Sequence, residues 1–207
     1  SSYAGTDSFT YVVEDEQGVS QTGSVTVNVI GPTRVLSVSG TTTVQEDQSF
    51  TFTLTLDSAA TEEITVLAST VAGTAGSGDY TEISDQLITF AVGETTKTVT
   101  VTVNDDALVE AEEVFSLVLS DPRSGGVSDI SKVKFSDGTI DDLSTQATIT
   151  DNDTASITVD DITVSESAGV ATFVVTLNQD IDIPITLSYI AVGNTATGTP
   201  PGSAVNP

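Results

Sequence analysis

The sequence has no cysteine, histidine, methionine or tryptophan among its 207 residues. Without cysteine, the chain can form no disulfide and has no thiol nucleophile. Without histidine, it lacks the commonest general base and the commonest zinc ligand. The oxygen ligands that remain suit a hard cation such as Ca²⁺ better than a transition metal.

Positive charge is also scarce. Five Lys and Arg residues face 30 Asp and Glu residues, which gives a formal net charge of −25 at pH 7. This charge opposes compaction by self-repulsion and would repel a polyphosphate, so we expect no nucleic-acid partner. Hydrophobic residues nevertheless make up 38% of the chain, which argues against disorder. Bound divalent cations are the expected source of balancing charge.

Long hydrophobic runs are missing as well. No apolar run reaches the roughly 18 residues of a membrane span, so we expect no direct span. A cysteine-free, acidic chain rich in Thr, Val and Gly is typical of secreted bacterial surface proteins. The composition therefore predicts an extracellular location at a bacterial cell surface.

What the sequence does contain is a hydrophobicity pattern that repeats every two residues. Apolar and polar side chains alternate through residues 50–56, 98–103 and 115–119, as in strands with one buried face. No segment shows a convincing helical pattern, and Gly, Asp and Ser turns separate the strands. The sequence predicts an all-β fold of Ig-like antiparallel β-sandwich domains in tandem.

An internal repeat refines the domain count. Residues Thr43–Leu56 and Thr163–Leu177 share a Thr-Val-x-Glu strand, a polar turn and an alternating strand with Phe. Glu46 and Glu166 lie 120 residues apart, a normal domain length. The second copy has counterparts of only the first few strands. It is followed by a Gly/Pro-rich tail with Pro200, Pro201 and Pro207.

The first 31 residues predict a β-hairpin, with strands at Asp7–Val13 and Ser24–Val29 and a turn at Glu14–Gly18. A lone hairpin is marginal in water, so we interpret it as the last two strands of an upstream domain. The predicted division is therefore 1–31, 32–153 and 154–207, as a window on a longer chain. The alternative is that neighbouring chains complete each other's sheets in a fibre.

Acidic residues collect at strand ends of the central domain, where alternate loops of a sandwich meet at one end. Several carboxylates in one place either take up protons or bind a cation. The other interpretation is a set of solvated acidic loops. The acidic residues in question are Glu46, Asp79, Asp105, Asp106, Glu110, Glu113, Asp151 and Asp153, and Asn152 lies among them.

The central domain contains five ordered motifs within about 120 residues, namely Val44–Glu46, Gly76–Tyr80, Ile88–Lys97, Asn104–Glu110 and Ala147–Asp153. Together these motifs resemble the Calx-beta domain family, and residues 154 to about 203 resemble the first half of another copy. Through Ala4–Tyr11, the hairpin more weakly resembles the end of a bacterial cadherin-like or Ig-like repeat.

This resemblance implies a seven-stranded Ig-like sandwich that binds Ca²⁺ at the end nearest the next domain, as in the regulatory loop of sodium–calcium exchangers. It implies that the acidic residues named above match the ligand motifs. Asn152 stands where those relatives often have a third Asp, and it could ligate through its amide oxygen. The second copy keeps Glu166 but lacks the Gly-x-Asp-Tyr and final Asp motifs.

Residues 122–146 form a long insertion with three of the five basic residues, Arg123, Lys132 and Lys134. A loop of this length is functional or mobile. Within it, Lys132–Phe135 is predicted to pair as a short strand with Gly138–Ile140.

The function predicted from these observations is a calcium-binding structural segment of an extracellular bacterial adhesin, stalk or fibre protein. Its expected partners are neighbouring repeat domains of the same chain, and other copies in a fibre. The alternative is a calcium-sensing regulatory domain of a membrane-associated protein. An enzyme is not expected, since the acidic residues have no aromatic sugar platform beside them.

Overall fold

The structure is a computed structural model that describes residues 5–29 and 31–193. The predicted tail prolines and Ala4 lie outside these residues. The chain forms two compact units. The first comprises Ser1–Asp106 and Glu112–Thr150, and the second comprises Ala107–Ala111 and Asp151–Pro207. The described residues are almost entirely strand and loop, so the predicted all-β class is confirmed.

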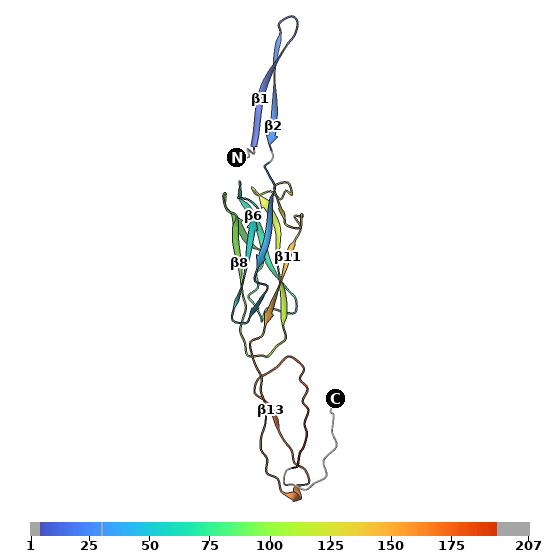
Figure 1. Cartoon of the computed structure of the whole chain (residues 1–207). Helices are drawn as coiled ribbons and strands as arrows, with labels where there is room; N and C mark the ends of the chain where they lie inside the picture. The colour runs from blue at the N-terminus through green and yellow to red at the C-terminus, as the bar shows by residue number, and fades with distance from the viewer. Residues whose placement is uncertain (1–4, 30, 194–207) are drawn as a thin grey trace. The chain divides into compact units, whose positions relative to one another are not determined.

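The first unit begins with the predicted hairpin, formed by β1 (Gly5–Glu14) and β2 (Ser20–Val29) in continuous antiparallel register (Figure 1). The side chain of Asp15 accepts hydrogen bonds from the amides of Gln17 and Val19 and so closes the turn. Gly18 has φ 81°, a left-handed conformation that favours glycine. The apolar side chains of the hairpin are exposed, Phe9 by 57%, so the hairpin contributes nothing to a core.

A β-sandwich follows the hairpin, with β6, β8 and β11 labelled in Figure 1. One sheet has the strand order β10-β3-β5-β8 and the other β4-β11-β9-β6-β7. The strands of the first sheet are β3 (Arg34–Gly40), β5 (Ser49–Leu56), β8 (Thr96–Thr102) and β10 (Val133–Phe135). Those of the second are β4 (Thr43–Gln45), β6 (Ile64–Ala72), β7 (Gln86–Phe90), β9 (Glu113–Ser124) and β11 (Leu143–Thr150).

The core lies between these two sheets and follows the predicted alternation. Phe50 and Leu54 of β5 are fully buried, while the threonines between them face outward. Phe115 of β9 lies edge-on to Phe50 at 5.2 Å and stacks on Tyr80 at 4.3 Å between ring centroids. Aromatic contacts of this kind add about 0.5–1.5 kcal/mol to the effect of burial. The aromatic residues therefore join the two sheets near the start of β5 and β9.

The strand register gives the sandwich two distinct ends. We call the end where β3 begins the entry pole, because Arg34, Leu56, Ile64 and Ser124 lie there. We call the end where β11 finishes the exit pole. The exit pole holds the end of β4, the start of β9 and the loops after β6 and β8.

Two pairings in this sandwich are parallel, β10 with β3 and β11 with β4. The prediction that 132–135 pairs as a strand with 138–140 is wrong. Gly138, at φ 92°, turns the chain after β10. The amide of Phe135 donates to the carbonyl of Thr139 and the amide of Gly138 donates to the carbonyl of Phe135, but residues 138–140 form no strand. Phe135 is fully buried, and burying it against the core requires β10 to lie along β3.

The second unit has little regular structure within its described residues. It contains β12 (Ile157–Val159), which pairs antiparallel with β13 (Val175–Leu177), and a 3₁₀ turn at Glu166–Ala168. Val170 is 73% exposed and Ile190 87% exposed. The apolar residues of the second copy are thus present but not gathered into a core. Among the described residues of the whole chain, no helix is long and apolar enough to cross a membrane.

Candidate metal centre

The exit pole gathers six of the carboxylates predicted as ligands into two groups. The first group is Glu46, Asp151 and Asp153, and the second is Asp79, Glu110 and Glu113. In each group, one oxygen from every carboxylate lies within 4.8 Å of the others. Oxygens bound to one Ca²⁺ at about 2.4 Å can be no farther apart than twice that length. Both groups therefore have the spacing of a partial calcium shell.

Glu46 of the first group is fixed by the parallel pairing of β4 and β11. Its amide donates to the carbonyl of Thr150 at 3.2 Å, which extends that ladder by one residue. The side chain of Glu46 is only 6% exposed. Asp47 then turns the chain away at φ 60°. A carboxylate buried in this way is costly unless it is protonated or meets a cation.

Asp151 follows β11 directly, and backbone donors orient its carboxylate. The amide of Glu110 donates to one of its oxygens at 2.9 Å, and the amide of Asp153 donates to the other at 2.6 Å. Such bonds hold the carboxylate in one orientation. Asp151 therefore joins a residue of each group by backbone hydrogen bonds.

Asp79 of the second group is held by the loop after β6. The amide of Gly76 donates to its carboxylate at 2.6 Å, and the amide of Asn104 donates to its carbonyl at 2.8 Å. The next residue, Tyr80, is buried and anchors the loop on Phe115. Gly73 passes so close to the carbonyl of Val114 that a Cβ would collide with it. This close approach brings the loop toward Glu113 at the start of β9.

The remaining predicted ligands are placed differently. Asp105, Asp106 and Asn152 are exposed, and neither Asp105 nor Asp106 belongs to either group. In the second copy, Glu166 lies exposed in the 3₁₀ turn. The prediction of nine ligands thus separates into six residues brought together by the structure and three at the surface.

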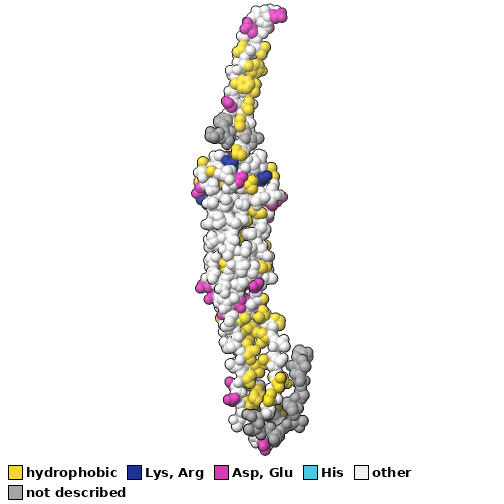
Figure 2. All heavy atoms as spheres, viewed as in Figure 1, with side chains coloured by type: hydrophobic (Ala, Val, Ile, Leu, Met, Phe, Trp, Pro, Cys, Tyr) yellow, Lys and Arg dark blue, Asp and Glu magenta, His cyan; other side chains and the backbone are white. Residues whose placement is uncertain are grey.

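The donor set of these groups consists of carboxylate oxygens, and the sequence has no histidine or cysteine to add. Nor does a basic side chain lie at the exit pole, because all five Lys and Arg residues occur toward the entry pole. Figure 2 shows the same separation on its visible face, with magenta but no blue at the end of the sandwich where the acidic residues gather. The five are Arg34, Lys97, Arg123, Lys132 and Lys134.

The loop that carries Glu110 is tied to residues of the second copy within the second unit. The amide of Val109 donates to the carbonyl of Asp180 at 3.1 Å, and the amide of Asp182 donates back to Val109 at 2.9 Å. The side chain of Gln179 donates to the carbonyl of Ala107 at 2.6 Å. A change in the position of Glu110 would therefore move the segment around residue 180 as well.

Comparison with known families gives one match. The family described as the Calx-beta domain matches residues 32–153 and again residues 148–202. A search of curated proteins gave no match.

Several solved structures are similar to part of the chain. The apo form of the Calx CBD1 domain is 22% identical, with a TM-score of 0.47, over 57% of this chain and 99% of that domain. The Calx CBD2 domain is 14% identical, with a TM-score of 0.46, over 56% of this chain and 86% of that domain. The CBD12 structure from CALX1.2 is 21% identical, with a TM-score of 0.46, over 56% of this chain and 44% of that structure.

Proposed function

The chain belongs to the Calx-beta domain family, and from this premise we propose that it is a calcium-binding structural segment of an extracellular bacterial adhesin, stalk or fibre protein. In this proposal, Ca²⁺ binds at the exit pole and stiffens the junction with the copy that follows. The partners are neighbouring repeat domains of the same chain, and other copies where chains form a fibre. The role is one of binding and support rather than catalysis.

The observation on which this proposal rests is the pair of carboxylate groups at a pole without basic side chains. Glu46 would contribute to the first ion together with Asp151 and Asp153, and Asp79 to the second with Glu110 and Glu113. A hard divalent cation would balance the negative charge that gathers there. Water, or the exposed Asn152, would complete shells of six to eight oxygens.

The stabilisation follows from linkage. An ion that binds only the folded state stabilises it by RT ln(1 + [Ca²⁺]/Kd), about 2.7 kcal/mol per site at 100-fold excess over Kd. Sites of the weak extracellular class, with Kd on the order of 10⁻⁴–10⁻³ M, are filled by millimolar calcium outside a cell. Because the loop with Glu110 also bonds to Asp180 and Asp182, an ion there would restrain the segment of the second copy around residue 180.

Isothermal titration with CaCl₂ tests the binding and separates the two candidate functions. We expect two sites with Kd on the order of 10⁻⁴–10⁻³ M, as in extracellular modules. The variants Glu46→Gln and Asp79→Asn should each weaken one site. Asp142→Asn, an exposed acid outside both groups, is the matched control. Sub-micromolar affinity would instead favour a calcium-sensing regulatory domain.

Stiffening needs a separate measurement. Since the chain has no cysteine, spin labels can be attached uniquely at Thr100→Cys and Thr158→Cys, both exposed strand positions. Double electron–electron resonance should give a broad distance distribution in EDTA and a narrow one in calcium. Calcium binding without narrowing would contradict the mechanical role while leaving the metal site intact.

A further inference from the structure

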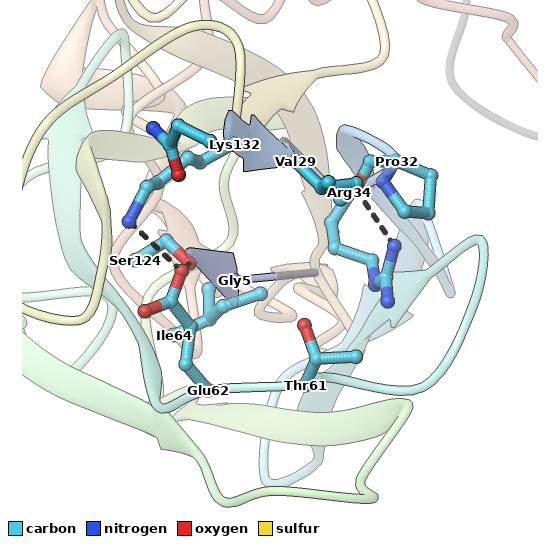
Figure 3. A pocket seen from close by; sticks show the side chains of 11 residues that line it. Gly5, Val29, Pro32, Arg34, Thr61, Glu62, Ile64, Ser124 and Lys132 are labelled. Atoms are coloured by element: carbon cyan, nitrogen blue, oxygen red, sulfur yellow. Dashed lines mark hydrogen bonds and ion pairs between the residues drawn. The ribbon is translucent and has the colours of Figure 1, made fainter. Parts of the chain in front are cut away.

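The entry pole has a pocket of its own, far along the sandwich from the carboxylate groups. Its volume is about 340 Å³. Its walls come from the base of the hairpin, from the linker at Gly31 and Pro32, and from the sandwich. In Figure 3, Arg34 and Lys132 lie on opposite sides of the pocket, with Thr61 and Glu62 between them. The lining includes two of the chain's five basic residues, although the chain as a whole is strongly acidic.

Arg34 is the unusual member of this lining because it is a buried cation, only 6% exposed. Its Nε donates to the carbonyl of Ala59 at 2.9 Å, and its Nη1 donates to the carbonyl of Pro32 at 2.8 Å. A guanidinium has five N–H donors, so these bonds leave Nη2 available. Among the described residues, no carboxylate lies within 4.0 Å of Arg34. A buried charge without a counter-ion is costly to keep.

The other charges of the pocket balance each other. Lys132 Nζ lies 3.1 Å from Glu62 Oε1, and the hydroxyl of Ser124 donates to the same carboxylate at 2.9 Å. The amine of Lys132 and the hydroxyl of Ser124 together hold the pKa of Glu62 below its ordinary value of 4.5, so Glu62 stays charged at neutral pH. Lys132 and Glu62 cancel, and the net positive charge of the lining is that of Arg34.

We propose that this pocket is a binding site for a single carboxylate group, held by the guanidinium of Arg34. A carboxylate matches the planar guanidinium group of an arginine, and its single negative charge would balance the positive charge of Arg34. The hydroxyl of Thr61, which also lines the pocket, offers a further donor. Phosphate is a poorer match, because its second charge would face Glu62.

The size of the pocket limits the ligand. Pockets for small molecules run from about 300 to 1,000 Å³, and this one lies at the lower end. It suits a short carboxylate, which is either a free small acid or an Asp or Glu side chain of another polypeptide. Since the walls include the hairpin base and the linker, a bound carboxylate would tie these segments to the sandwich.

The test is a titration of the ¹⁵N-labelled chain with sodium acetate, against sodium chloride at equal ionic strength and fixed calcium. We expect saturable shifts of the Thr61 and Ser124 amides with acetate only. Arg34→Lys keeps the charge but not the fork and should weaken acetate binding about tenfold. Arg34→Gln should abolish the shifts. Lys97→Gln, which removes a basic residue of the same pole outside the pocket, should leave them unchanged.

A parallel titration with a blocked tripeptide, acetyl-Gly-Asp-Gly-amide, distinguishes the sources of the carboxylate. Tighter binding of the peptide than of acetate would assign the site to a protein side chain, and the reverse would assign it to a free acid. Equal shifts with chloride and acetate would overturn the proposal, and so would acetate binding unchanged in a folded Arg34→Gln variant. Dispersed amide spectra establish that each variant folds.

Discussion

The two poles of the central sandwich treat negative charge in different ways. At the entry pole, carboxylates meet basic side chains, as in the pairs of Lys97 with Glu94, Arg123 with Asp121 and Lys132 with Glu62. At the exit pole, two groups of three carboxylates gather where the chain has no Lys or Arg. Carboxylates of the entry pole have basic side chains beside them, whereas we propose that a cation from the solvent balances those of the exit pole. Calcium should therefore leave the stability of the entry pole unchanged and should increase the stability of the exit pole.

A change in the core between the two sheets should have the largest effect, and the effect should not depend on calcium. Phe115 of β9 contacts both Phe50 and Tyr80 in this core. Phe115→Ala should lower the free energy of unfolding by about 3–5 kcal/mol through lost burial and the cavity left behind. Urea unfolding in calcium and in EDTA should give the same loss. A loss confined to calcium would mean that Phe115 acts mainly through the Asp79 loop.

Removing calcium should affect the exit pole and not the entry pole. We expect EDTA to lower the free energy of unfolding by about 2.7 kcal/mol per site relative to calcium at 100-fold over Kd. Differential scanning calorimetry in EDTA, in CaCl₂ and in MgCl₂ measures the effect. Mg²⁺ demands tighter octahedral geometry and should restore less. Identical melting temperatures in all three solutions would contradict a metal at the exit pole.

The variant Glu46→Gln tests the calcium dependence of the exit pole at a single residue. The loss of one buried ligand should weaken the first site about tenfold and lower the calcium-dependent stability by about 1.4 kcal/mol. In EDTA the same variant should be as stable as the parent chain or more so, because one of three close carboxylates is gone. Equal destabilisation with and without calcium would mean that Glu46 serves the fold rather than an ion.

The entry pole should respond to pH instead. The amine of Lys132 and the hydroxyl of Ser124 lower the pKa of Glu62 in the folded chain. The pair therefore stabilises the fold above the ordinary glutamate pKa, and this stabilisation is lost as the pH falls through the lowered value. Both side chains are more than a third exposed and screened by solvent, so the effect is at most about 1 kcal/mol. Glu62→Gln should lower the melting temperature slightly at pH 7 and not at pH 3.

The smallest effect is expected at Asp105 and Asp106. Both are exposed and lie outside the two groups. The double variant Asp105→Asn and Asp106→Asn should change the free energy of unfolding by no more than about 0.5 kcal/mol, as is usual for surface positions. Calorimetry beside Glu46→Gln provides the measurement. A loss as large as that of Glu46→Gln would place these residues in the metal shell.

Much of the fold could be predicted because local patterns determine it. Alternation at 50–56 identified a buried face, and the hairpin followed from two alternating runs around a glycine turn. The gathering of acidic residues at one end was predictable too, since loops after β6, β8 and β11 lie on the same side. Which acidic residues lie together was not predictable, because it depends on loop details such as the close approach of Gly73 to Val114.

Other features depend on long-range packing that no local pattern carries. The prediction for residues 132–135 assumed a nearby partner, but β10 pairs with β3, almost 100 residues earlier in the chain. The pocket at Arg34 was also missed, because a single arginine at the start of a strand carries no signal of burial. The rarity of basic residues in this sequence could nevertheless have drawn attention to Arg34. In the second copy, the described residues carry the repeated motif while their large apolar side chains remain exposed.

The parallel pairing of β4 with β11 has a consequence for a chain under tension. The chain enters through β3 at one pole and leaves through β11 at the other, so pulling on its two ends drags β4 and β11 in opposite directions along their lengths. Their hydrogen bonds are then loaded in shear and must break together, not one after another as in a zipper. Glu46 adds its bond to Thr150 at the end of this ladder, so the place where force would leave the sandwich coincides with the first carboxylate group.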